Sequence, residues 1–190
     1  MHGKRLWQTL RLYTTLSSTK RTQYLKDKQV FGAIGDHCSI MSRVVPLYAK
    51  LIRLGNNVRI ASKVTFVTHD VTHVMLNDNP SLKGERFQEK IGCIEIQDNV
   101  FVGAGSTILY GVQIGTNVII GAGSLVNKDI PSNSVAAGVP SKVIGSFDEY
   151  LSKRRAENTY PDELRPRNEL ISAETAEWCW REFNESHNQN

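Results

Sequence analysis

Cysteine and long hydrophobic runs are both scarce in this sequence, and each scarcity excludes a class of protein. The three cysteines, Cys38, Cys93 and Cys179, are odd in number and widely spaced, and they contain no CxxC pair. They predict reduced thiols instead of a disulfide framework or a zinc site. No apolar stretch is long enough to span a bilayer. Residues 6–16 are too polar for the core of a signal peptide. We therefore expect a cytoplasmic protein without an integral membrane segment.

Excess charge of either sign is also small. The 190 residues include 23 Lys and Arg and 19 Asp and Glu, which gives a formal net charge of +4. A balance of this size is typical of a mildly basic surface, so no nucleic-acid partner is predicted. The length suffices for one domain with a substantial core and some appendages.

A period of six residues organises the middle of the chain. Large β-branched aliphatic residues recur at every sixth position: Ile96, Val102, Ile108, Ile114, Ile120 and Val126. This period fits neither an α-helix nor a simple alternating strand. It is typical of a solenoid of hexapeptide rungs, in which each coil stacks its aliphatic side chains on those of the next. Asp98, Asn99 and Asn117 suit the tight corners between rungs, where φ is often positive.

The same period begins earlier in the chain and is interrupted. It starts at Ile34, breaks over residues 45–53 and resumes at Leu54. The separation of Leu54 from Ile96 is a multiple of six, so we expect both blocks to share one register. The polar segment between them is too long for a turn and predicts an extruded loop over residues 70–93. Long ordered loops on a rigid scaffold are usually functional.

The first 30 residues have the texture of two helices, with Ser17, Ser18 and Thr19 breaking the pattern and capping the second helix. We expect the apolar side of this segment, with Leu6 and Leu10, to pack on the solenoid, because the open end of a solenoid needs a cover. The alternative for a basic amphipathic helix is a place on a membrane surface.

Residues 146–190 differ in character and predict a helical C-terminal extension. Helices are expected over residues 147–155 and 172–183, separated by the segment from Pro161 to Pro166. The aromatic residues of the second helix are expected to be its buried anchors, and the alternative is a ligand platform: Trp178, Trp180 and Phe183. Residues 184–190 are expected to be frayed.

Three runs in the middle of the chain resemble the hexapeptide-repeat acyltransferases. They are Val102–Ser106 (VGAGS), Ile120–Ser124 (IGAGS) and Val135–Pro140 (VAAGVP). The similarity is greatest to the maltose/galactoside O-acetyltransferases and the capsule and lipopolysaccharide sugar O-acetyltransferases. It implies a mainly β fold over residues 31–145, a left-handed parallel β-helix with three short strands per coil. It also implies a homotrimer with active sites between subunits, acetyl-CoA as cosubstrate, and no metal.

The resemblance further implies which residues carry the chemistry. A hydroxyl is a poor nucleophile and needs a base as it attacks a thioester, and histidine has a suitable pKa. His69, at the mouth of the extruded loop, matches the family's catalytic histidine, and the loop then becomes the acceptor loop. Asp70 would orient the imidazole, contact the acceptor or simply be solvated, and His73 would contact the acceptor or be exposed. The backbone N–H of Ala104 matches the donor to the oxyanion.

Small residues along one edge of the solenoid are implied to receive the pantetheine of CoA. The matching positions are Ala104, Ala122, Ser124 and Asn127, followed by the basic residues Lys128 and Lys142 near the phosphates. Asn127 stands where relatives often have Thr or Ser. Lys142 stands where they often have Arg, so it keeps the charge but not the bidentate geometry.

Several functions remain open on the same scaffold. The first is O-acetylation of a sugar or glycan precursor; the others are N-acetylation of a nucleotide-linked amino sugar and acetylation of an antibiotic. A serine acetyltransferase is disfavoured because its long helical N-terminal domain is not seen. A zinc enzyme would need three convergent histidines, yet none of the five histidines lies in residues 96–144. A non-catalytic scaffold would need neither His69 nor CoA.

Overall fold

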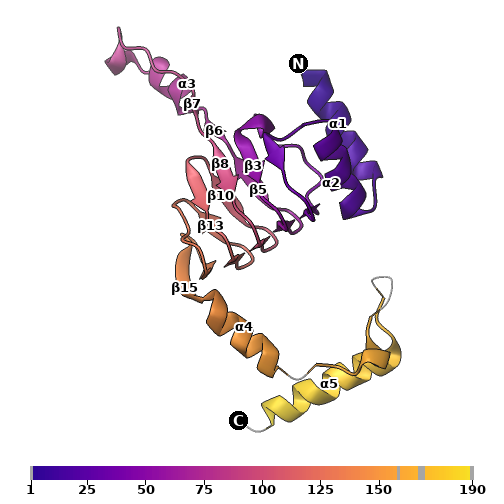
Figure 1. The fold of residues 1–190 in the computed structure, drawn as a ribbon. Coiled ribbons are helices and arrows are strands. Elements are labelled where there is room, and N and C mark those ends of the chain that lie inside the picture. The colour runs from indigo at the N-terminus through magenta and orange to yellow at the C-terminus, as the bar shows by residue number, and fades with distance from the viewer. Residues whose placement is uncertain (1, 158, 167–169, 189–190) are drawn as a thin grey trace. The chain divides into compact units, whose positions relative to one another are not determined.

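The computed structural model describes residues 2–157, 159–166 and 170–188. The chain forms two compact units, Met1–Tyr150 and Leu151–Asn190. The first unit is a stack of short parallel strands with helices α1 (His2–Thr14) and α2 (Ser18–Asp27) at its N-terminal end (Figure 1). The boundary expected after residue 145 falls inside this unit. Within the described residues no helix is both long and apolar enough to cross a membrane.

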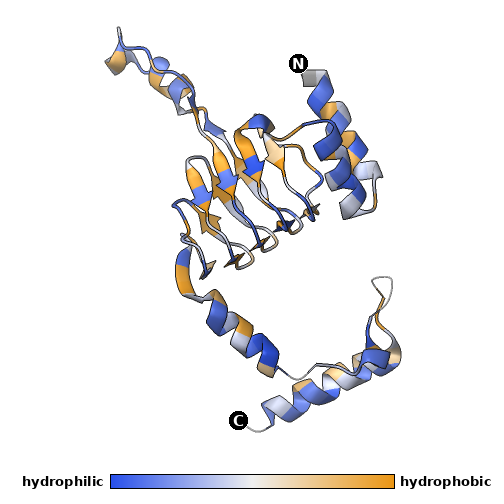
Figure 2. Ribbon diagram, in the orientation of Figure 1, coloured by the Kyte–Doolittle hydropathy of each residue, from blue (hydrophilic) through white to orange (hydrophobic). Residues whose placement is uncertain are grey.

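The six-residue pattern marks the interior of the stack. The eleven aliphatic and aromatic residues that define it are all buried: Ile34, Ile40, Leu54, Ile60, Phe66, Ile96, Val102, Ile108, Ile114, Ile120 and Val126. Stiff β-branched side chains suit this position because each stacks on its equivalent in the next coil. In Figure 2 the strands accordingly carry much of the hydrophobic colour. The predicted hexapeptide core is confirmed.

Three sheets form the sides of the stack. The first orders its strands as β1 (Ala33–Ile34), β3 (Ile52–Leu54), β8 (Ile94–Ile96) and β11 (Val112–Ile114). The second orders them as β5 (Thr65–Val67), β10 (Thr107–Leu109) and β13 (Leu125–Val126). The third contains β2 (Ser39–Ile40), β4 (Arg59–Ile60), β9 (Val100–Val102), β12 (Val118–Ile120), β14 (Ser134–Ala137) and β15 (Lys142–Ser146).

The register between coils follows the sequence period across the interruption. Leu54 pairs with Ile96 and Ile96 pairs with Ile114, in parallel. The extruded loop is therefore inserted between two coils without shifting their side-chain faces, as the spacing predicted. The expected break over residues 45–53 is shorter than predicted, because the 3-10 turn η1 (Ala49–Leu51) leads directly into β3 at Ile52.

Asparagine side chains form a ladder along one corner. The Nδ2 groups of Asn57, Asn99 and Asn117 each donate to the Oδ1 of the next asparagine, at 3.0, 3.1 and 2.9 Å, and the series ends at Asn133. All four residues have φ between 55° and 59°, the left-handed region that asparagine tolerates. The positive φ expected at Asn99 and Asn117 is confirmed, whereas Asp98 is not among the positive-φ residues.

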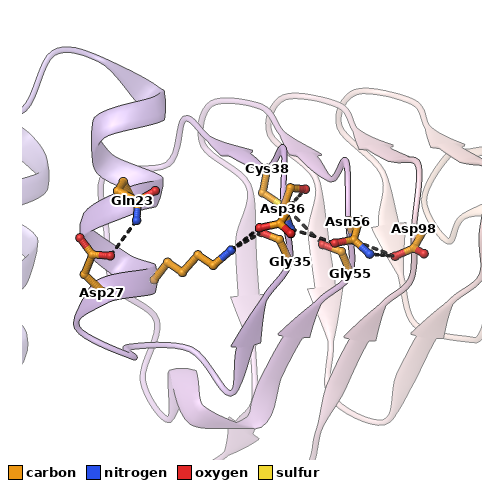
Figure 3. Close-up of polar contacts among 9 residues, drawn as sticks. Gln23, Asp27, Gly35, Asp36, Cys38, Gly55, Asn56 and Asp98 are labelled. Carbon is orange, nitrogen blue, oxygen red and sulfur yellow. Dashed lines mark hydrogen bonds and ion pairs between the residues drawn. The ribbon is translucent and has the colours of Figure 1, made fainter.

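The corner beside this ladder is also tied through carboxylate and amide groups (Figure 3). Asp98 Oδ1 accepts from the backbone N–H of Asn56 at 2.6 Å, and Asn56 Oδ1 accepts from that of Asp36 at 2.9 Å. Lys26 of α2 donates to Asp36 at 2.6 Å and so joins the helix to the first coil.

Helix α2 covers the N-terminal edge of the stack. Ser17 caps it by accepting from the backbone N–H of Lys20, as the sequence predicted. Thr22 of α2 is buried, and its hydroxyl accepts at 2.8 Å from the N–H of Ile40, in an edge strand. Leu25 is buried beside it. Helix α2 thus covers the open edge of the solenoid and gives an edge N–H a hydrogen-bond partner, as expected.

Helix α1 differs from the expectation. Leu12 is buried, but Leu6, Leu10 and Tyr13 remain exposed, so most of the apolar side does not pack on the solenoid. The reason is the helical wheel: at 3.6 residues per turn, Leu12 projects from the side of the helix opposite to these three residues.

The extruded loop is anchored by a short antiparallel pair, β6 (His69–Asp70) and β7 (Lys90–Ile91). Beyond this base lie a short helix, α3 (Thr72–Asn77), and a 3-10 turn, η2 (Pro80–Leu82), and the loop projects away from the coils (Figure 1). The sequence predicted the loop but neither of these elements inside it.

The C-terminal end closes with β15, which runs antiparallel to β14. Helix α4 (Phe147–Ala156) follows, then the 3-10 turn η3 (Asp162–Leu164) and helix α5 (Ala173–His187), capped by Ser172. Both helices were predicted, but α5 continues to His187, so residues 184–187 are not frayed; residues 189–190 lie outside the described residues. The prediction that three aromatic residues of α5 are buried is partly wrong. Trp178 is half-buried against Tyr160, whereas Trp180 and Phe183 are exposed.

Candidate active site

His69 lies where the chain leaves the second sheet. Strand β5 ends at Val67, and the buried Thr68 hydroxyl then donates to the Leu47 carbonyl at 2.7 Å. His69 pairs with Ile91 across the base of the loop, and the N–H of Gly92 donates to the Thr68 carbonyl at 2.9 Å. The histidine is therefore fixed on a short strand at the root of the loop, as its position in the sequence predicted.

Tyr48 supports the imidazole from the segment before β3. Its ring packs edge-on against His69, with centroids 5.3 Å apart and planes at 75°. The Tyr48 hydroxyl donates to the Glu89 carboxylate at 3.0 Å, and this bond raises the pKa of the phenol. The Nδ1 atom of His69 is buried and has no hydrogen-bond partner within the described residues. The ring is thus held by packing and by its strand.

Asp70, the next residue, is held by three donors. Its Oδ1 accepts from the Thr72 hydroxyl at 2.6 Å and from the Thr72 N–H at 3.2 Å, and its Oδ2 accepts from Tyr110 at 2.6 Å. Lys90 Nζ lies 5.3 Å from the centre of the Tyr110 ring. The bonds from Thr72 and then Tyr110 lower the Asp70 pKa to about 2. At neutral pH Asp70 is therefore an ionised, fixed acceptor that ties the loop to the coil of Tyr110.

His73 lies on α3, one turn beyond this cluster. It is half-buried, and its Nδ1 is buried without a hydrogen-bond partner in the described chain. Its contact with an acceptor stays a prediction.

Two of the positions implied for the oxyanion and the pantetheine lie at another corner. Ala104 and Ala122 are exposed neighbours there, since the N–H of Gly123 donates to the Ala104 carbonyl at 2.8 Å. They precede β10 and β13, whereas His69 follows β5 in the same sheet. The two groups therefore occupy opposite ends of paired strands, and one chain does not bring them together.

Ser124 does not fit the role implied for it. The residue is only 2% exposed, and its hydroxyl donates to the Gly121 carbonyl at 2.6 Å and accepts from the N–H of Gly138. Its side chain points into the coil because it stands two residues before the inward-facing Val126, with the pleat period of two. Ser124 stabilises the turn and is not available to a cofactor on the surface.

The remaining cofactor candidates are exposed. Asn127 and Lys128 follow β13, and Lys142 begins β15 opposite Ala137. Lys128 lies two residues beyond Val126, which is in register with Ile108 and Phe66, so it lies at the same corner as His69, two coils away. Lys142 lies in the third sheet.

Tyr48, Glu89 and Tyr110 were not found by sequence reasoning. They carry no motif, and they reach the site only because the coil and the loop fold back on each other. Tyr110 follows the buried Ile108 by two positions in its rung, which places it at the same corner as His69 in the neighbouring coil. The position of Tyr110 in the sequence, at a corner one coil away from the predicted base, could have indicated its place in the site.

A groove elsewhere on the first unit differs from the His69 site in the residues that line it. It crosses the outer face of the third sheet and is lined by Arg59, Phe101 and Ile119 together with Phe147 and Tyr150 of α4. It contains no histidine, and it lies on a different sheet from His69. Across the described ranges there is also no group of three His, Cys, Asp or Glu side chains suited to a metal ion.

Comparison with known proteins identifies the family. The family described as bacterial transferase hexapeptide (six repeats) matches residues 94–128. The chain is 36% identical over 137 residues to a galactoside O-acetyltransferase of Lactococcus lactis, covering 61% of this chain and 63% of that protein. It is 38% identical over 124 residues to protein CapG of Staphylococcus aureus, covering 63% and 69%. The match thus spans slightly less than two thirds of the Lactococcus protein.

A solved structure is similar over a greater length. A galactoside acetyltransferase in complex with coenzyme A is 28% identical, covers 84% of this chain and 86% of that one, and superposes with a TM-score of 0.53. The coils and the site define a hexapeptide-repeat protein. The chain belongs to the bacterial transferase hexapeptide family.

Proposed function

We propose that the protein is an acetyl-CoA-dependent O-acetyltransferase acting on a hydroxyl of a sugar or glycan precursor. The observation that carries the proposal is His69, fixed at the root of the extruded loop by the strand pair β6–β7 and by the ring of Tyr48. The similarity to two proteins named as galactoside acetyltransferases, one of them in complex with coenzyme A, supports the donor and the acceptor class.

The proposed assembly is a cytoplasmic homotrimer of left-handed β-helices. It is supported by the separation of the two halves of the site in one chain. His69 and Ala104 stand at opposite ends of paired strands, so a neighbouring subunit would supply Ala104, Ala122 and Lys142 opposite the histidine. Sedimentation velocity tests this arrangement, and a fully active monomer would contradict it.

The proposed reaction is a direct transfer in which His69 exchanges one proton. Nδ1 is the buried ring nitrogen, so Nε2 takes the proton of the acceptor hydroxyl while the oxygen attacks the thioester carbon. The tetrahedral intermediate then collapses with cleavage of the C–S bond. The imidazolium returns its proton to the departing thiolate, and the products are an acetate ester and CoA with a free thiol. A base of this kind accelerates reactions by roughly 10²–10⁴-fold.

The chain's other residues position the reacting groups. The backbone N–H of Ala104 donates to the oxyanion of the intermediate. Ala122 and Asn127 leave room for pantetheine, and Lys128 and Lys142 meet the phosphates. Asp70 and His73, at the base and first turn of the loop, contact the acceptor. Asp70 stays ionised because Thr72 and Tyr110 donate to it, which suits acceptance of a hydrogen bond from a sugar hydroxyl.

The test is thiol release from acetyl-CoA in the presence of sugars, nucleotide-linked amino sugars and antibiotics, with wild type beside His69→Ala. We expect release with a sugar acceptor and a loss of at least about 100-fold in the variant. His37→Asn is the control, because His37 is an exposed histidine at a corner of the first coil with φ of 57°, which asparagine tolerates. Turnover that survives His69→Ala would contradict the assignment of the base. Absence of CoA binding and of release with every acceptor would favour a non-catalytic scaffold.

A further inference from the structure

Helix α1 presents an apolar surface to solvent. Leu6 is 70% exposed, Trp7 72%, Leu10 51% and Tyr13 53%. On a helical wheel these four side chains fall within about one third of the circumference, which makes one continuous stripe that we call the α1 outer face. In Figure 2 the hydrophobic and hydrophilic residues of α1 alternate along the helix, as expected for an amphipathic segment.

The opposite side of α1 is fixed to the first unit. Leu12 is 1% exposed, and the Thr9 hydroxyl accepts from the N–H of Val45 at 3.4 Å. Arg43 donates to the Tyr13 carbonyl at 2.7 Å. The α1 outer face therefore points outward because the helix is docked by its other side.

The turn after α1 is fixed as well. Arg21 is 3% exposed, and its guanidinium donates to the carbonyls of Thr15 and Leu16, both at 2.6 Å. An arginine buried in this way holds the end of α1 against α2. The apolar stripe is thus part of a defined surface.

The charged residues of α1 itself have one sign. The helix contains Lys4, Arg5 and Arg11 and no Asp or Glu. Lys4 and Arg11 border the α1 outer face on the side of Trp7, as their positions on the wheel place them. An apolar stripe with Trp and Tyr beside basic residues is complementary to the boundary of an anionic lipid surface.

We propose that α1 binds the surface of an anionic phospholipid bilayer, with its outer face inserted at the headgroup boundary and Lys4 and Arg11 among the phosphates. The helix lies in the plane of the membrane, because its 13 residues are too few to cross a bilayer. Binding of α1 to lipid does not require the proposed catalytic activity. A second copy of this chain would be a different occupant, and it would not require that α1 lacks acidic side chains.

The first test is flotation of the full chain with vesicles. The two compositions are pure phosphatidylcholine and phosphatidylcholine mixed with phosphatidylglycerol. We expect binding to the anionic vesicles that weakens as salt is raised. Leu6→Gln/Leu10→Gln should abolish it, and circular dichroism should show that the variant keeps its fold, since both side chains are exposed. Equal binding to both compositions, or none to either, would overturn the proposal.

Charge variants with a matched control distinguish binding through α1 from non-specific electrostatic adsorption of the whole chain. Lys4→Gln/Arg11→Gln should weaken binding by roughly fivefold per charge removed. Lys153→Gln/Arg155→Gln removes two exposed charges from α4 and should leave binding unchanged. Equal losses in the two variants would mean that only net charge matters and would contradict a role for α1.

Trp7 provides a direct reading of insertion. The chain has three tryptophans, and Trp178→Phe/Trp180→Phe leaves Trp7 as the only one. Its emission should shift to shorter wavelength when anionic vesicles are added, because the indole leaves water. If the emission does not move, and Leu6→Gln/Leu10→Gln instead changes the sedimentation of the lipid-free protein, a second copy occupies this face and the proposal is wrong.

Discussion

Tyr110 and Asp70 lie 40 positions apart in the chain and are joined by a hydrogen bond of 2.6 Å. The bond connects a corner of one coil to the base of the loop that the preceding coil extrudes. It places a fixed carboxylate beside His69 without using any residue of the hexapeptide core. The loop is thus held to the scaffold at the point where the proposed base is located.

Tyr110→Phe removes this bond and keeps the ring. We expect kcat/KM to fall by about tenfold or less, since Thr72 continues to hold the other oxygen of Asp70. The Asp70 pKa should rise towards its ordinary value, which carbon-detected NMR of the carboxylate can follow. Tyr150→Phe is the control, because this exposed tyrosine lies on α4. Unchanged activity together with an unchanged Asp70 pKa would show that the bond has no role in solution.

Acid should weaken the fold through the same carboxylate. Because the pKa of Asp70 is lowered to about 2, the folded state binds fewer protons at this site than the unfolded chain, whose aspartate pKa is roughly 3.9. The contribution of Asp70 is therefore complete above that unfolded value and is lost as pH falls from about 4 to 2. Urea unfolding across this range should show a smaller pH dependence for Asp70→Asn than for wild type. Equal pH dependence in both proteins would contradict the assignment.

The two contacts of Tyr48 can be separated by two substitutions. Tyr48→Phe removes the bonds to Glu89 but keeps the ring against His69, whereas Tyr48→Ala removes both. We expect a loss of about threefold or less in kcat for the first and of about tenfold or more for the second, because an imidazole that is free to rotate is misplaced for proton transfer. The pH–rate profile shows whether the loss reflects the base. Similar losses for both variants would assign the effect to Glu89 and the loop.

The solenoid could be predicted because its information is periodic and local. Each coil needs an inward-facing aliphatic residue at the same position. The pairing of Leu54 with Ile96 could therefore be predicted from their separation in the sequence, which is a multiple of six. The loop base was predictable for the same reason, since His69 directly follows a rung. Tyr48 and Glu89 were not predictable, because their contact depends on how two irregular segments fold over the corner. No period connects them.

The predicted burial of the terminal helices was wrong for a different reason. Apolar residues on a helix predict a face, but they do not say whether the chain itself covers that face. On α1 the side with Leu12 is covered and the side with Leu6 is not. On α5 the same assumption failed for Trp180 and Phe183. Exposure of this kind is visible only in the folded chain.

The asparagine ladder predicts how corners contribute to stability. Asn117 has φ of 57°, donates to Asn133 and accepts from Asn99. Asn117→Ala loses both bonds and places an alanine in the left-handed region, so we expect a loss of about 2–3 kcal/mol in the free energy of unfolding. Asn117→Gly loses the bonds but adopts this φ freely, and the loss should be about 1 kcal/mol smaller. Equal losses, measured by urea denaturation, would show that backbone strain does not matter at this corner.

Lys142 provides a test of the donor end of the proposed site. The side chain is exposed at the start of β15, so its interaction with a phosphate of CoA is screened by solvent and salt. Lys142→Gln should raise the KM for acetyl-CoA by roughly two- to fivefold, with kcat unchanged, and the difference should shrink at high salt. Lys142→Arg should restore or improve the KM, because a guanidinium binds phosphate through two parallel bonds. Lys153→Gln on α4 is the matched control for loss of one exposed charge. A fall in kcat at constant KM would mean that Lys142 acts on the folded state or the chemical step and does not bind the phosphate.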